Sequence, residues 1–155
     1  MNGLQSSTST SSSLGQMFSQ AQRSHQSTQW SGVVFVSELS QWQIDAIRKL
    51  DQLHALPRDW DSYGSSPPSE IAVKAAVRLI LDIDFDYFVS PHIVPISGGG
   101  VQLEWSLGSR EVEIEIDSEG SAEYLECSFG KPIEEGPISL VDVAQVRSLL
   151  TRLLT

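Results

Sequence analysis

Two alternating runs on either side of Gly108-Ser109 constrain the fold of this chain more than any other feature. Apolar side chains occupy every second position of residues 101–107 and again of residues 111–117. A period of two residues is typical of a strand with one buried face, and a two-residue loop that begins with Gly is typical of a type II′ hairpin. The segment therefore predicts two antiparallel strands with one dry face.

The length of this loop also predicts which residues face each other. On the outer face, Glu104 is expected opposite Glu113, and Gln102 opposite Glu115. The predicted inward pairs are all apolar, which supports this register: Trp105 with Val112, Leu103 with Ile114, and Val101 with Ile116.

A second tight turn at Glu119-Gly120 predicts a third strand, in which Leu125, Cys127 and Phe129 alternate toward the core. If this loop also has two residues, Glu126 lies opposite Glu113 on the outer face. The expected outer face is then an acidic row across three strands with neighbours on either side: Glu104, Glu113 and Glu126 in the row, Glu111 and Glu115 beside it, and Gln102 and Tyr124 opposite Glu115.

Most of the negative charge lies in this predicted sheet. The formal net charge of the chain is −10, and residues 101–135 contain ten acidic and two basic side chains, a balance of −8. Like charges that face each other in a sheet cost a few tenths to about 1 kcal/mol per pair. Three interpretations stay open: a solvated face that deters edge pairing, a face that binds a cationic partner, and a divalent-metal site.

The same charge argues against several partner classes. Binding to a phosphate backbone needs Lys and Arg, so we expect no direct nucleic-acid partner and no anionic membrane surface. No stretch approaches the roughly 18 consecutive apolar residues of a spanning helix, and the N-terminus has neither the cationic start nor the apolar core of a secretory signal. The single cysteine, Cys127, fits a reducing compartment. We therefore expect a cytoplasmic protein.

Helices are predicted on both sides of the sheet in sequence. Apolar residues at helical spacing, with Ser40 and Gln43 at capping-box spacing, predict a helix over residues 40–55. A second helix is predicted to about residue 81, with Pro67-Pro68 in its first turn and Ser66 or Ser69 as its cap. Ser139 and Asp142 resemble a capping box for a final helix that continues to the C-terminus.

These elements predict an α+β fold. A short strand at residues 92–96 and a turn at Gly98–Gly100 precede the alternating strands, and residues 130–138 are expected to form an irregular loop. The expected architecture is an antiparallel meander of three to four strands packed against two or three helices, in the order α-α-β-β-β-β-α. Residues 30–155 form the expected single domain, in which Val33–Val36 is a strand or an apolar lead-in. Residues 1–29, rich in Ser and Gln, are expected to be a disordered tail.

No motif predicts a catalytic residue, a cofactor or a resident metal. Asp82, Asp84 and Asp86 have the spacing of a calcium loop, but Tyr87 stands where Gly is needed and Ile93 where the bidentate Glu belongs. Gly98–Gly100 leads into a strand and lacks the Lys-Ser/Thr of a phosphate loop. Cys127 is expected to be a buried structural thiol. Trp60 and Tyr63, in a polar loop between two helices, are either partner contacts or plugs of the core.

Two motifs together resemble a known family. Trp60-Asp61-Ser62-Tyr63-Gly64 with Pro67-Pro68-Ser69 precedes a helix, and Gly99–Trp105 (GGVQLEW) precedes the Glu-rich strand. The chain is similar over about residues 56–154 to small bacterial proteins with a W-D-x-Y-G segment and a G-G-x-Q-L-E-W strand, which have no established activity. Ser62 and Ser65 depart from the Gly and Ala of that pattern. The resemblance implies a bacterial or phage source.

The sequence thus favours a non-enzymatic interaction protein. We expect the acidic face to bind a basic protein partner, as an accessory subunit, an antitoxin-like protein or an inhibitor would. Two other classes stay open. A hydrolase could use the clustered carboxylates with or without a metal, provided that a pocket separates their pKa values. Alternatively, the acidic face could imitate nucleic-acid phosphates and block a DNA- or RNA-binding protein.

Overall fold

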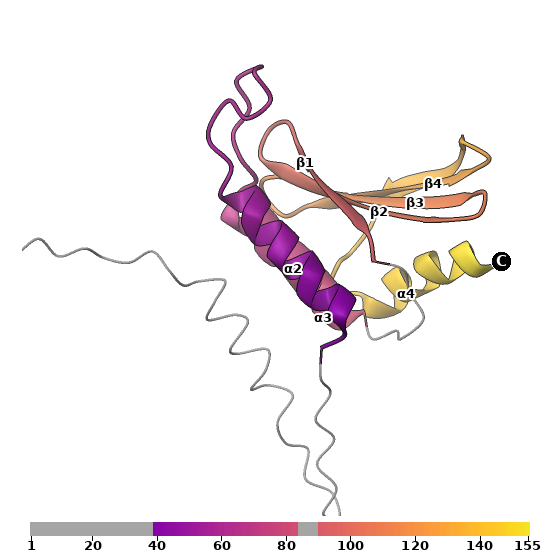
Figure 1. Ribbon diagram of the computed structural model, residues 1–155. Coiled ribbons are helices and arrows are strands. Elements are labelled where there is room, and N and C mark those ends of the chain that lie inside the picture. The colour runs from indigo at the N-terminus through magenta and orange to yellow at the C-terminus, as the bar shows by residue number, and fades with distance from the viewer. Residues whose placement is uncertain (1–38, 84–89) are drawn as a thin grey trace, which may run out of the picture. The chain divides into compact units, whose positions relative to one another are not determined.

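A five-stranded antiparallel meander covered by helices on one face is the frame of the domain (Figure 1). The computed structural model describes residues 39–83 and 90–155. The α+β class and the element order of the prediction are confirmed, with one strand more than expected. The described elements are α2 (Gln41–His54), α3 (Glu70–Asp82), β1 (His92–Ile96), β2 (Gly100–Leu107), β3 (Arg110–Ile116), β4 (Ala122–Ser128), β5 (Lys131–Pro137), α4 (Val143–Thr151) and the 3-10 helix η1 (Arg152–Leu154).

Several predictions fall on residues outside this described part. They are the tail of residues 1–29, the segment Val33–Val36, and two members of the aspartate run, Asp84 and Asp86. Within residues 39–83 and 90–155, no helix is long and apolar enough to cross a membrane.

The start of α2 is bonded to the end of α3. The predicted capping box is present, because the Ser40 N–H donates to Gln43 Oε1 at 2.9 Å. The other end of the same buried side chain, Gln43 Nε2, donates to the carbonyls of Ile80 at 2.9 Å and Ile83 at 3.2 Å. One glutamine therefore caps one helix and satisfies carbonyls at the end of the next.

The start of α3 is bonded to two turns of the sheet. Ser69 is the cap, and its Oγ accepts from the Ala72 N–H at 3.0 Å, so the two prolines precede the helix and do not lie in its first turn as predicted. Ser69 Oγ donates to the Ser118 carbonyl at 2.7 Å, and the Ser69 N–H donates to the Gly99 carbonyl at 2.8 Å. A Cβ at Gly99 would lie 3.4 Å from the Pro67 carbonyl oxygen, and Gly99 has a φ of 86°. The two motifs of the predicted resemblance therefore meet at this helix start.

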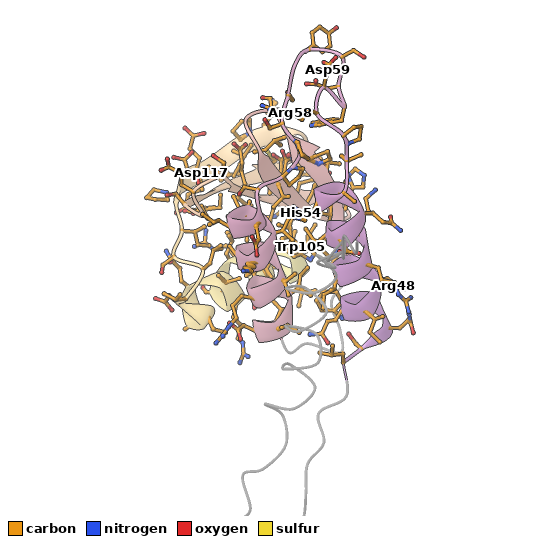
Figure 2. The ribbon with its side chains drawn as sticks, turned by 90° about the vertical axis from the view of Figure 1, so that its left-hand side faces the viewer. Arg48, His54, Arg58, Asp59, Trp105 and Asp117 are labelled. Carbon is orange, nitrogen blue, oxygen red and sulfur yellow. The ribbon has the colours of Figure 1, made fainter. Side chains whose placement is uncertain are left out.

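The inner face of the sheet supplies most of the core. Helix α3 packs on β2 and β3, α2 packs on α3 and β1, and η1 packs on β2 and β3. Trp105, marked in Figure 2, is 1% exposed beneath these helices. The register between β2 and β3 is the predicted one at every pair, since Gly108, with a φ of 62°, turns the chain in two residues.

The register between β3 and β4 differs from the prediction by one residue. Ile114 faces Tyr124 and Glu113 faces Leu125, whereas Glu126 was expected opposite Glu113. The reason is a loop of three residues in place of two. The Asp117 N–H donates to the Ser121 carbonyl at 2.9 Å, so Ser118, Glu119 and Gly120 form the loop, with Gly120 at a φ of 90°. One added residue moves every β4 side chain to the opposite face.

Residues 131–137 form β5, so the irregular loop predicted for residues 130–138 is wrong. Pro132 and Pro137 and a bulge between Glu126 and Cys127 hide the two-residue period of this strand. Prolines suit an edge strand, where they need no ladder hydrogen bond. The other edge strand, β1, also contains a proline, Pro95. Both edges of the sheet are therefore poor templates for pairing with another strand.

The cap of α4 also differs from the prediction. Asp142 caps the helix, and its Oδ1 accepts from the Gln145 N–H at 3.1 Å. Ser139, the expected cap, donates its own N–H to Gln145 Oε1 at 3.2 Å. The helix begins three residues later than a Ser139 cap implies.

The turn between β4 and β5 places a bulky residue in a strained conformation. Phe129 and Gly130 have φ values of 51° and 69°, the type I′ geometry that favours Asn-Gly. The Phe129 side chain is 82% exposed, so burial does not offset the strain.

We expect Phe129→Asn to raise the free energy of unfolding by about 1 kcal/mol in urea titrations.

The control for this prediction is Phe129→Ala, which removes the ring but keeps a residue that disfavours positive φ. It is expected to change stability much less than Asn does. Equal effects of Ala and Asn would contradict the strain account.

Candidate interaction face

The side of the sheet away from the helices carries six carboxylates, which we call the acidic face. Two pairs face each other directly across strands, Glu104 with Glu113 and Glu115 with Glu123. The members are Glu104, Glu111, Glu113, Glu115, Glu123 and Glu135. The predicted acidic surface therefore exists, with Glu123 and Glu135 as members that the sequence prediction did not name.

The charges on this face repel one another. The pKa of Glu113 is raised, first by desolvation and then by the negative charges of Glu104, Glu111 and Glu115. A raised carboxyl pKa means that the ionised form is disfavoured in the folded chain. An external cation placed near Glu113 would therefore stabilise its ionised form.

Few cations among the described residues compensate these charges. His92 Nδ1 lies 3.6 Å from Glu104 Oε2, in an exposed pair at the β1 edge. The described strands contain two Arg or Lys residues, Arg110 and Lys131. Both belong to the cross-strand row that also contains Leu107 and Ser128. This row lies on the helix side of the sheet. The acidic face thus lacks an Arg or Lys of its own strands.

An apolar strip lies beside the carboxylates. Leu125 is half-buried between Glu113 and Glu135, and Cys127, which is 7% exposed, faces Glu111 and Pro132. Cys127 is buried as predicted, but on the outer face, because of the register change. Its pKa is raised by desolvation and by Glu113 and Glu111, so the reactive thiolate is disfavoured.

Two further predicted site residues have different outcomes. Gln102 faces Glu115 on the outer face, as expected. Tyr124, expected opposite Glu115, faces Ile114 on the helix side of the sheet. Its hydroxyl donates to Glu134 Oε1 at 2.9 Å, and this bond is the main reason why the pKa of Tyr124 is raised.

Glu126 is not part of the acidic face, in contrast to the prediction. It faces Val112 on the helix side of the sheet and is 3% exposed. Each carboxylate oxygen has its own arginine: Arg110 Nη1 lies 2.9 Å from Oε1, and Arg152 Nη1 lies 2.9 Å from Oε2. A buried carboxylate requires such partners, so Glu126 is a structural residue.

A larger ion cluster forms around Glu126. Arg152 also pairs with Glu134, on β5. The pKa of Glu134 is lowered by the Tyr124 hydroxyl and then by Arg152, and the pKa of Arg152 is raised by Glu126 and Glu134. We call these residues the ion cluster: Arg110, Tyr124, Glu126, Glu134 and Arg152. The sequence prediction gave no role to its two arginines or to Glu134.

Trp60 and Tyr63 lie in the loop before α3, but their surroundings differ. Trp60 is half-buried, and its Nε1 donates to the Ser66 carbonyl at 3.1 Å, which is a structural role. Tyr63 is 93% exposed, so it plugs no part of the core. Asp61 holds this loop in place, because its Oδ1 accepts from the N–H groups of Tyr63 at 2.9 Å and Ser65 at 3.2 Å.

The same hydrogen bonds explain the titration of Asp61. Its pKa is lowered, first by the Ser65 hydroxyl, which donates to Asp61 Oδ2 at 2.5 Å, and then by the Tyr63 N–H. Asp59, at the top of the view in Figure 2, adds a further bond: its Oδ1 accepts from the Gly64 N–H at 2.6 Å. The loop therefore presents Tyr63 on a backbone that is already ordered.

In three comparisons with known proteins, no protein-family model matches the chain, and no curated protein or solved structure shows significant similarity to it. The resemblance inferred from the two motifs stays a prediction. Among residues 39–83 and 90–155, no group of three or more His, Cys, Asp or Glu side chains could hold a metal ion.

Substitution of two glutamates of β4, one on each face of the sheet, is expected to change the free energy of unfolding by different amounts. Glu126→Ala removes charge-assisted hydrogen bonds to two partly exposed arginines, so it is expected to lower the free energy of unfolding by about 1.5–3 kcal/mol. Glu123→Ala, on the exposed acidic face, should stay within about 0.5 kcal/mol of the parent protein. Urea titrations of both variants measure the difference. Similar small effects at both positions would show that Glu126 is not buried.

Neutralising Glu113 should stabilise the folded chain in a pH-dependent way. Because the folded pKa is raised, ionisation of Glu113 weakens folding as pH rises through that pKa. Glu113→Gln is therefore expected to gain about 0.5 kcal/mol at neutral pH. The gain should fade as pH drops through the ordinary glutamate range, about 4.3. Thermal melts at pH 7 and pH 3.5 measure it.

The matched control is Glu119→Gln, which removes one negative charge from the exposed loop between β3 and β4. An equal gain from both substitutions would mean that net charge alone is responsible. It would contradict a specific repulsion on the acidic face.

Proposed function

We propose that this chain is a non-enzymatic protein-interaction module that binds a basic protein partner through the acidic face. The observation that carries the proposal is the arrangement of carboxylates in facing pairs, without an Arg or Lys from the same face of the described strands to neutralise them. The members are Glu104, Glu111, Glu113, Glu115, Glu123 and Glu135.

Repulsion within the face supports binding of cations. Each facing pair costs a few tenths to about 1 kcal/mol, and Glu113 takes part in one such pair with a raised pKa. Lysine or arginine side chains placed over the face would remove this repulsion and add attraction of their own. They would also accelerate association at low salt, since a surface of one sign steers a partner of the other.

The edges of the sheet support docking on the face in place of strand addition. Pro95 in β1, and Pro132 and Pro137 in β5, interrupt the two edges. A partner strand needs a continuous row of backbone donors and acceptors, which prolines break. A partner therefore gains more from side-chain contacts on the acidic face than from backbone pairing at an edge.

The spacing of the carboxylates suggests how the partner is built. Glu111, Glu113 and Glu115 follow one another along β3 at every second residue, roughly 7 Å apart. Basic side chains on one face of an extended segment have the same period. Leu125 lies beside this row and would contact an apolar residue of the partner.

Tyr63 is a second candidate contact. It is 93% exposed on a loop that Asp61 and Asp59 hold by hydrogen bonds, so binding would cost little ordering of the loop. Tyrosine is frequent at the energetic centres of interfaces. The proposed biological classes are an accessory subunit, an antitoxin-like protein or an inhibitor, in the cytoplasm.

The test compares two variants of equal net charge. Glu113→Gln with Glu115→Gln removes two charges from the acidic face, and Asp51→Asn with Glu119→Gln removes two exposed charges elsewhere. The tagged parent protein is first used to isolate a basic partner from its host at low salt. The acidic-face variant is then expected to bind that purified partner at least about tenfold more weakly, with a flatter salt dependence, while the control variant binds like the parent.

Equal binding by both variants would refute the acidic face as the docking surface. Competition of the same complex by duplex DNA would identify the partner as a nucleic-acid-binding protein, in which case the face imitates phosphates. Loss of binding in both variants to the same degree would indicate an effect of net charge and would also contradict the proposal.

A further inference from the structure

We propose that α4 and η1 form a strap that opens independently of the rest of the domain, and that Arg152 holds this strap closed. The C-terminal strap, Val143–Leu154, runs beneath the strands in Figure 1. The proposal concerns the helix side of the sheet, so it does not depend on the proposed function of the acidic face.

The strap is too short to be helical by itself. Helix α4 has nine residues, fewer than the roughly 12–15 that an isolated helix needs in water. It therefore exists only while its apolar side is docked. That side consists of Val146, Leu149, Leu150 and Leu153, each no more than 5% exposed. Burial of four aliphatic side chains is of the same order as the entropy lost when a segment of this length becomes ordered.

A small opening lies at the first turn of the strap. It has a volume of about 10 Å³, room for roughly one water molecule, and lies between the end of α3 and the start of α4. Its walls are mainly apolar, with Leu79 and Ile83 on one side and Val143 and Val146 on the other. The end of the strap is held by the sheet, where η1 packs on β2 and β3.

Arg152 is the ionic contact between this end and the sheet. Its Nη1 lies 2.9 Å from Glu126 Oε2, and it also pairs with Glu134. When the strap opens, Glu126 keeps Arg110 on its other oxygen, at 2.9 Å, and water can reach the oxygen that Arg152 leaves. Opening thus leaves no buried charge without a partner, so the sheet has no electrostatic reason to unfold with the strap.

A buried tryptophan lies on a strand that the strap contacts. Trp105 shares a register row with Val112 and Glu126, is 1% exposed, and its Nε1 has no hydrogen-bond partner in the described structure. A buried donor without a partner costs free energy in the closed state. The α2–α3 pair is bonded through Gln43 and does not depend on the strap.

The experiment is hydrogen–deuterium exchange of the full chain at neutral pH, read by mass spectrometry. Amides of residues 146–153 are expected to exchange at least tenfold faster than the interior amides of β2 and β3, because the strap opens without global unfolding. Arg152→Gln should accelerate exchange of the strap by about 10- to 100-fold, the range expected for loss of a hydrogen bond to a charged group. Arg48→Gln, on the exposed side of α2, is the control and should leave the strap unchanged.

Two results would overturn the proposal. If the strap and the interior of β2 and β3 exchange at the same rate in the parent protein, the strap opens only with the whole domain. This comparison needs no variant, so it decides the matter even if Arg152→Gln fails to fold. If Arg152→Gln folds and leaves the strap rates unchanged, Arg152 does not hold the strap.

Discussion

The three-residue turn Ser118–Gly120 decides which side of the sheet each β4 side chain occupies. Asp117 holds this turn: its Oδ1 accepts from the N–H groups of Glu119 and Ser121, each at 2.9 Å, and Gly120 adopts the positive φ that closes it. The same turn is fastened to the helices, because Ser69 donates to the Ser118 carbonyl. A turn of two residues would exchange the two faces of β4 and place Glu126 in solvent.

With this register, the sheet has two faces with different electrostatic character. The helix side buries Glu126 between Arg110 and Arg152, so its charges are neutralised within the chain. The outer side keeps facing carboxylates without an Arg or Lys from the described strands, and the pKa of Glu113 is raised first by desolvation and then by their repulsion. The first arrangement holds the C-terminal strap, and the second leaves attraction available for a partner. Both arrangements depend on the third residue of the loop between β3 and β4.

The sequence predicted the parts of the fold in which local chemistry is decisive. The β2–β3 register followed from a Gly-first loop, and the start of α2 followed from Ser40 and Gln43. The β3–β4 register was missed because Glu119-Gly120 resembles a two-residue turn, although Asp117 and Gly120 have the spacing of a type I turn. Strand β5 was missed because its prolines and bulge remove the alternation. The pairing of Arg152 with Glu126 joins residues far apart in the sequence, and no local pattern indicates it.

The register of β4 can be measured directly by cross-strand nuclear Overhauser effects in solution. Hydrogen bonds from the Phe129 N–H to the Ser109 carbonyl and from the Asp117 N–H to the Ser121 carbonyl mark the hydrogen-bonded pairs of β3 and β4. The pairs between them, Val112 with Glu126 and Ile114 with Tyr124, are then the close ones, with Cα atoms roughly 4.5 Å apart. Strong Hα–Hα signals within these two pairs are the predicted result. A strong signal between Glu113 and Glu126 would contradict the account, because it would return Glu126 to the acidic face.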